Sequence, residues 1–315
     1  MGSRANGPTG LTGQLSALQL FFQQVLNGVT LGAIYALIAL GYTMVYGVIR
    51  LINFAHGEVF IAGAYAALSV LLLTHAGGPW GLALAAAAAG AMAACALLGL
   101  AIERAAYRPV RHAPRLNAFI TAIGMSFFLQ NALMLVYGAN DRQFPALIPP
   151  MRWVFGGLHV TLMQLLVWAS GGAMMAVLHA LVMRTKLGTA MRATAQDLVA
   201  CALLGIPVNR VIAATFAIGS AFAALGGVLF GLNYGTINFH DGYLMGMKAF
   251  TAAVLGGIGN VQGAVVGGLV LGLLEGLGAG YLSAQWKNAF AFVILVGLLL
   301  FKPTGLLGER IAERA

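Results

Sequence analysis

Stretches of roughly 20 apolar residues recur along this chain of 315 residues. A helix of about that length crosses the hydrocarbon core of a bilayer. The composition agrees, because 60% of the residues are hydrophobic and only 8% are charged, whereas soluble domains carry about 25% charged residues. The apolar surface is too large to hide in a soluble core. We therefore expect an all-α polytopic membrane protein.

About nine segments are expected to cross the membrane. The seventh is short for a regular crossing and contains Lys248, so it is predicted to be a broken or half-depth helix. Such backbone is tolerated at membrane depth where protein or a water-filled cavity covers it. The nine segments are residues 21–48, 54–73, 80–102, 118–137, 160–183, 211–232, 244–256, 263–281 and 289–300.

The positive charges predict the orientation. With nine crossings, the loops on the side of the C-terminus hold twelve Lys and Arg residues, and the other side, with Lys248 included, holds five. Cytoplasmic loops carry the excess of positive charge, so the N-terminus is expected outside and the C-terminus inside. Residues 1–16 are expected to be a flexible segment whose MGS start resembles an expression remnant, and residues 309–315 a cytoplasmic tail. The net charge of +9 does not predict nucleic-acid binding, because basic patches interleaved with aromatic residues are absent.

A short motif occurs twice. INFAHGEVF begins at Ile52, and INFHDGYLM begins at Ile237, 185 residues later. In the expected topology the copies lie on opposite sides of the membrane, which predicts an inverted repeat with halves at 21–137 and 211–303 and a connector span at 160–183. Inverted repeats place a substrate path near the midplane, often beside discontinuous helices. The alternative is chance similarity between apolar segments, but the matching residues include Asn and Gly.

Several polar residues and glycines are candidates for a path or gate. Those beside the motif have two interpretations: they cap the following helix, or they line the path. Lys248 and Glu275 are expected to pair across neighbouring helices, with Glu275 pointing into the bundle, because lipid exposure of its charge would be costly. Glu275 is the acidic residue expected well inside a span. The candidates are Asn53, His56, Glu58, Asn238, Asp241, Lys248, Gly257, Gly259 and Glu275.

No catalytic chemistry is expected. His56-Gly57-Glu58 matches H-x-E, but the P-C-x-x-C partner of zinc deaminases is missing. The chain has no Gly-Lys dipeptide and hence no Walker A lysine. We expect neither an enzyme nor a bound metal or cofactor, and any ATP must be bound by a separate chain.

The polar segment 184–210 is predicted to hold a short amphipathic helix outside the membrane that ends before Pro207. It would face a partner protein or, alternatively, lie on the lipid headgroups. The candidate partner contacts are Arg192, Asp197, Leu204 and Gly205.

Seven ordered motifs between Phe21 and Gly308 give a family resemblance. They include NGVTLGAIYALIALGYTMVYGV, INFAHGEVF, IERAAYRPVR, AIGMSFFLQN, DLVACALLGI, GMKAFTAAVLGGIGNVQGAVVGGLVLGLLE and KPTGLLG. Together they resemble the LivH-type permease of bacterial high-affinity branched-chain amino acid ABC importers. Arg50 departs from the small or apolar residue expected at its position.

The resemblance implies an ABC importer permease fold in the bacterial inner membrane, forming half of a path for leucine, isoleucine or valine. It implies a second, LivM-like permease, two cytoplasmic ATPases and a periplasmic binding protein, and it places the coupling helix in 184–210. Urea and short-chain amide permeases share much of the pattern. An ion-coupled secondary transporter and a passive channel are two further classes that apolar helices of this kind can build.

Overall fold

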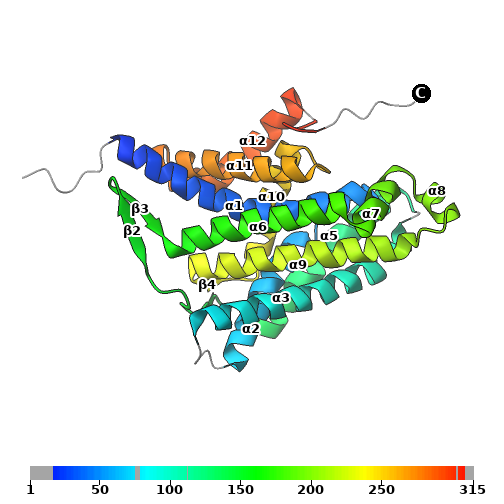
Figure 1. Ribbon diagram of the computed structural model, residues 1–315, viewed down its shortest axis with the longest axis horizontal. Helices are drawn as coiled ribbons and strands as arrows, with labels where there is room; N and C mark the ends of the chain where they lie inside the picture. Colours follow the sequence, from blue (N-terminus) through cyan, green and yellow to red (C-terminus); the bar gives the residue numbers. More distant parts are fainter. Residues whose placement is uncertain (1–16, 75–78, 112, 303, 309–315) are drawn as a thin grey trace, which may run out of the picture.

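The computed structural model describes residues 17–74, 79–111, 113–302 and 304–308. Most of these residues form helices, and the longest of them run along the long axis of the molecule (Figure 1). The expected flexible segment 1–16 and the expected tail 309–315 lie outside the described residues. The all-α polytopic class is confirmed.

Seven helices in the described part are long and apolar enough to cross a membrane, and two shorter helices occupy the places of the seventh and ninth expected segments. The long helices are α1 (Ala17–Ile49), α2 (His56–Leu73), α3 (Trp80–Ile102), α5 (Arg115–Tyr137), α6 (Leu162–Arg184), α9 (Val208–Tyr234) and α11 (Val261–Tyr281). The shorter ones are α10 (Asp241–Gly256) and α12 (Lys287–Phe301). A π-helical turn, η1 (Glu103–Tyr107), and α4 (Arg108–Val110) extend α3.

The two ends of the bundle differ. At one end lies the hairpin of β2 (Arg152–Phe155) and β3 (Leu158–Thr161), and at the other lie α7 (Lys186–Gln196) and α8 (Leu198–Leu203) (Figure 1). The loops expected in the cytoplasm gather at the α7–α8 end: Arg50 and Arg192 line one cavity there. Lys248, which the charge count placed outside, is instead buried within the bundle.

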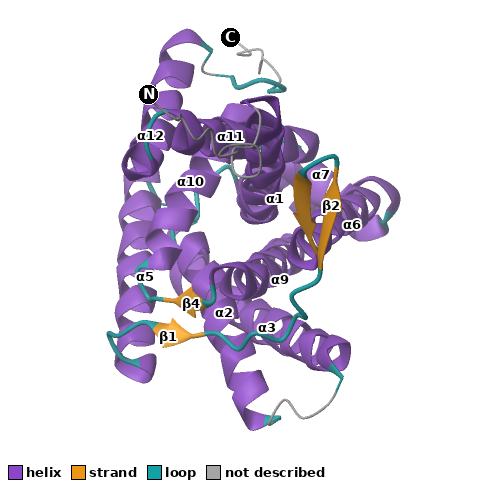
Figure 2. Cartoon of the chain, turned by 90° about the vertical axis from the view of Figure 1, so that its left-hand side faces the viewer, coloured by secondary structure: helices purple, strands orange, loops and turns teal. Residues whose placement is uncertain are grey.

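The packing of the helices shows the inverted repeat. Helix α1 packs on α11 as α9 packs on α3, and α10 packs on α1 and α11 as α2 packs on α9 and α3. The two motif copies lie at opposite ends of α5. Tyr107, ahead of α5, donates to the Asn53 Oδ1 at 3.1 Å, whereas Asn238 donates to the Oδ1 of Asp141, beyond α5, at 2.6 Å. The strand after α9, β4 (Thr236–Ile237), pairs with β1 (Arg142–Gln143) at this second end (Figure 2).

Glycines let α1 and α11, the two helices with the most extensive mutual contact, approach closely. A Cβ on Gly272 would overlap the backbone of Gly32, and one on Gly276 would lie 2.8 Å from the Gly28 Cα. In lipid, where the hydrophobic effect does not drive helix association, such close backbone packing holds helices together. Helix α1 thereby becomes the core of the bundle, with a nearly continuous buried stretch from Gly32 to Val45.

A buried ion pair ties α10 to this core. The Lys248 Nζ lies 2.7 Å from the Glu275 Oε1, and the Tyr35 hydroxyl on α1 donates to the Glu275 Oε2 at 2.8 Å. Both charged side chains are almost fully buried, at 3% and 0% exposure. The expected pairing across neighbouring helices is confirmed, as is the inward direction of Glu275.

Removing one member of this pair should destabilise the protein strongly. Lys248→Met leaves the Glu275 charge buried without its cation, which typically costs about 3–5 kcal/mol. Lys248→Met combined with Glu275→Leu should restore much of the loss, because no charge remains. Thermal unfolding of the purified protein in detergent measures both. Equal losses in the single and double variants would contradict a role for the pair.

Arg50 ends α1 in a strained conformation. Its φ is 53°, and among the described residues it is the one non-glycine residue with a positive φ. Its counterpart in the second repeat is Gly235, which ends α9 at a φ of 72°. Glycine adopts this left-handed conformation without steric cost, whereas other residues are disfavoured there. The repeat therefore explains why Arg50 departs from the expected residue type.

Exchanging these two residue types should have opposite effects. Arg50→Gly relieves the steric strain and is expected to raise stability by about 1 kcal/mol. Gly235→Arg introduces the same strain in the other repeat and should lower it by a similar amount. Melting temperatures of the two purified variants test this, and a fall for Arg50→Gly would show that the arginine side chain outweighs the strain.

Candidate functional site

The two motif copies carry the chain back into the bundle. After α1 ends at Ile49, residues 50–55 turn inward, and the His56 ring lies against Gly41. Gly41 lies two turns before the end of α1, or about 12 Å along its axis. The second copy returns inward in the same way from the opposite end, after α9.

The amino ends of α2 and α10 consequently meet inside the protein. A Cβ on Gly57 would overlap the Gly242 carbonyl and lie 2.7 Å from the Gly246 Cα. Gly57 and Gly242 are equivalent positions of the repeat, so the pseudo-twofold axis passes between them. The repeat predicts a path at an interface of this kind.

The expected broken helix takes a different form. Helix α10 is continuous over its 16 residues, and the interruption is the segment that precedes it. Helix α10 is followed by its C-cap residue, Gly257, which has a φ of 105°. Gly257 also lies in close contact with the Gly308 backbone, which holds the turn after the helix. Gly259, with a φ of 98°, lines a cavity of about 320 Å³ with Arg50 and Arg192 at the α7–α8 end.

The capping interpretation is wrong for Asn53 and His56. Helix α2 has no hydrogen bond from a capping side chain at its amino end. Asn53 accepts from Tyr107 instead, and the His56 ring is buried against α1. Sequence reasoning missed this because the partner, Tyr107, lies on a distant π-helical turn.

Glu58 lies deep in the bundle. It is 1% exposed, and its Oε1 accepts a hydrogen bond of 3.2 Å from the hydroxyl of Ser126, the central residue of α5. Its Oε2, which a Cβ on Gly242 would approach to 2.5 Å, has no hydrogen-bond partner among the described residues. The expectation that Glu275 is the acidic residue well inside a span was therefore incomplete, because the inward turn before α2 places Glu58 inside the bundle as well.

The corresponding residues of the second copy bond locally. The Asp241 Oδ2 accepts from the Asn238 amide at 2.8 Å, and the Asn238 Oδ1 accepts from the His240 amide at 3.0 Å. The two copies thus share a backbone shape, but only the first presents a fully buried carboxylate oxygen without a hydrogen-bond partner within the described residues.

A cavity of about 200 Å³ adjoins Glu58. It lies between α2, α5 and α10, and two of its lining residues, Ser126 and Gly242, contact the Glu58 carboxylate. The lining residues are Tyr42, Phe54, Ile123, Ser126, Phe127, Gly242, Tyr243, Gly246 and Met247.

The predicted helix in 184–210 is in fact two helices. Asp197 separates α7 from α8 in an extended conformation, and its Oδ1 accepts from the amides of Val199 and Ala200 at 2.8 and 2.9 Å. Asp197 therefore caps α8, a role typical of aspartate at this position. Sequence periodicity missed the break because one residue between two helices barely shifts the apolar pattern.

The tip of this segment is apolar and exposed. Val199, Leu203 and Leu204 are 70%, 84% and 81% exposed. Gly205, at a φ of 80°, ends the tip with open space around it. Arg192 points the other way, because its guanidinium contacts the Val182 carbonyl oxygen and lines the cavity beside Arg50.

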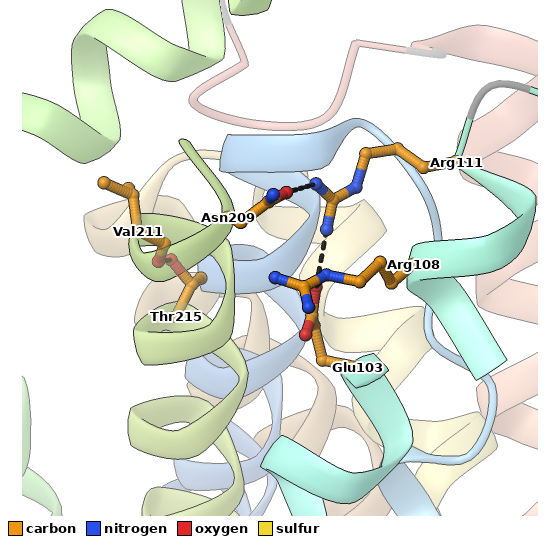
Figure 3. A network of polar contacts seen from close by, with 6 residues as sticks. All are labelled: Glu103, Arg108, Arg111, Asn209, Val211 and Thr215. Carbon is orange, nitrogen blue, oxygen red and sulfur yellow. Dashed lines mark hydrogen bonds and ion pairs between the residues drawn. The ribbon is translucent and has the colours of Figure 1, made fainter. Parts of the chain in front are cut away.

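An ion-pair network that the sequence did not reveal braces this end (Figure 3). The buried Glu103 Oε1 lies 2.5 Å from an Arg111 nitrogen and 3.8 Å from Arg108, and Arg111 also donates to Asn209 at the start of α9 at 2.7 Å. Burial lowers the pKa of Arg111. The only signal was one acid amid the arginines of IERAAYRPVR. The network fixes the helix that directly follows the α7–α8 segment.

No group of three or more metal-binding side chains occurs within the described residues. The arrangement is a membrane bundle with a polar point at its centre and an apolar tip at one end. That combination suits the passage of a solute through the bundle and the contact of a partner at one end.

Comparison with known proteins identifies the family. The profile described as branched-chain amino acid transport system / permease component matches residues 24–299. The chain is 48% identical over 302 residues to the high-affinity branched-chain amino acid transport system permease protein LivH of Escherichia coli K12, covering 93% of this chain and 97% of that protein. It is 47% identical to BraD of Pseudomonas aeruginosa, covering 93% and 98%. No solved structure matches significantly.

The chain is a multi-pass membrane transport protein. It belongs to the family of branched-chain amino acid ABC transport permeases.

Proposed function

We propose that this chain is the permease subunit of an ATP-driven importer and forms half of the path for leucine, isoleucine and valine. The observation that carries the proposal is the 48% identity to LivH along nearly the whole of both chains. The meeting of two inverted repeats beside a buried carboxylate supports a solute path. ATP would be bound by other chains, since this one lacks a Walker A lysine.

The importer would contain a second, LivM-like permease, two cytoplasmic ATPases and a periplasmic binding protein. The α8 tip supports an ATPase contact, because three large apolar side chains stand exposed on a short capped helix. The network around Glu103 would transmit movement of that tip to α3 and α9 as rigid bodies.

An ion-coupled secondary transporter fits the structure less well. Such a protein should hold two acidic residues together in the membrane for its ion. Here Glu275 is paired with Lys248, and Glu58 accepts a hydrogen bond from Ser126 on α5. The two buried glutamates therefore do not form an acidic pair with each other.

Uptake by the complete importer in proteoliposomes tests the substrate and the energy source. Radiolabelled leucine should accumulate only with ATP on the side of the ATPases and the loaded binding protein on the other side. Excess isoleucine or valine should compete, whereas urea and acetamide should not. Proteoliposomes with an ATPase-inactive partner are the control. Uptake without nucleotide, or competition by urea alone, would overturn the proposal.

Substitution of the α8 tip should release the ATPase. Leu203→Asp with Leu204→Asp places charge in an apolar contact and is expected to cost about 2 kcal/mol or more, which weakens binding about thirtyfold. The matched control is Val154→Asp on the hairpin at the opposite end, which is 60% exposed. Copurification of ATPase with tagged permease measures both variants. Full copurification with the Leu203/Leu204 variant would favour a headgroup-bound α8.

A further inference from the structure

The cavity beside Glu58 has the composition of a site for an apolar amino acid. It lies at the level of Ser126, the midpoint of the spanning helix α5, and at the interface of the two repeats. Phe54, Ile123, Phe127 and Met247 supply apolar walls. Gly242 and Gly246, which pack closely against α2, form part of one wall.

Ser126 supplies a polar group to this largely apolar lining. The Ser126 hydroxyl lines the cavity and donates to the Glu58 Oε1 at 3.2 Å, so its lone pairs remain available to a ligand that donates hydrogen bonds. Directly behind it, the Glu58 Oε2 has no partner among the described residues. A buried carboxylate oxygen without a partner is costly, and a cation reaching this point would remove that cost.

The neighbouring cation does not fill this role. Lys248 lies on α10 as well, but its ammonium is bound to Glu275 and faces Tyr35 on α1. Within the described residues, no Lys or Arg forms an ion pair with Glu58. The charge that the cavity recognises must therefore come with the ligand.

We infer that this cavity is a transit site for the substrate, with the α-ammonium group at Ser126 and Glu58 and the branched side chain against Phe54, Ile123 and Met247. The inference rests on the proposed function and assigns it a substrate feature. A neutral amide or urea offers no ammonium to Glu58, so the site separates amino acids from amides inside the membrane.

Neutralising Glu58 should impair transport and leave energy coupling intact. Glu58→Gln keeps the side-chain size and the bond from Ser126 but removes the charge, which typically weakens binding of a cationic group about tenfold or more. Leucine uptake by the complete importer should fall by that factor, while ATP hydrolysis stimulated by the loaded binding protein stays within about twofold. Asn117→Asp, which alters an exposed residue near the start of α5 outside the cavity, is the matched control, and its uptake should be unchanged.

Protection from a thiol reagent locates the substrate directly. Phe127→Cys, in a background without Cys95 and Cys201, places a thiol at the cavity wall, where Phe127 is 57% exposed. During turnover, leucine should slow its modification in the protein with Glu58 and not in the Glu58→Gln variant. This measurement decides the matter even if Glu58→Gln lowers assembly.

The outcomes separate the two proposals. If the unaltered importer does not carry leucine, the proposed function fails. If it carries leucine, and Glu58→Gln carries it equally well without loss of protection at position 127, only the transit site is overturned.

Discussion

The close contact of two helix amino ends at Gly57 and Gly242 is the constraint on which the structure depends. A chain that stops a helix inside a membrane must cover its free backbone groups, since lipid offers them no hydrogen bonds. Here each interrupted segment is covered by the other repeat and by α5. The side chains that bind the two segments differ, but both lie around α5: Tyr107 before it and Asp141 after it. Glycine is required at the contact because a Cβ there would overlap the facing backbone.

The same contact makes the two halves unequal in chemistry although they are alike in backbone. At the position where α10 carries Lys248, α2 carries Gly63, which packs against Ala224. The second half is therefore fastened to the core by a buried ion pair. The first half carries Glu58 beside a cavity, with one carboxylate oxygen that has no hydrogen-bond partner in the part of the chain that the structure describes. The second repeat thus holds the Lys248–Glu275 ion pair, whereas the first holds Glu58 beside the cavity. The centre of the bundle is therefore asymmetric in its side chains although the two backbones are related by the repeat. A path for one solute needs such a difference, because a fully symmetric centre would present the same groups in both directions.

Energy coupling would enter at the end where α3, α9 and the α7–α8 segment join. Glu103 and Arg111 hold the start of α9 against the end of α3, so that α8 is the least embedded part of this region. The carboxylate of its capping residue, Asp197, already accepts hydrogen bonds from two backbone amides of α8. A partner bound there would consequently meet apolar side chains, and the charge of Asp197 would serve to shape the helix that presents them.

The sequence by itself determined the membrane class, the approximate crossings, the inverted repeat and the pairing of Lys248 with Glu275. These follow from the length of apolar runs, from a motif found twice, and from the cost of leaving a charge in lipid. They are local or pairwise properties that residue types reveal. The break at Asp197, the partner of Asn53, the ion pair of Glu103 and the depth of Glu58 were decided only by the tertiary structure. Each depends on how far a short segment turns back into the bundle and on which distant helix then faces it, and hydropathy along the chain carries no information on either.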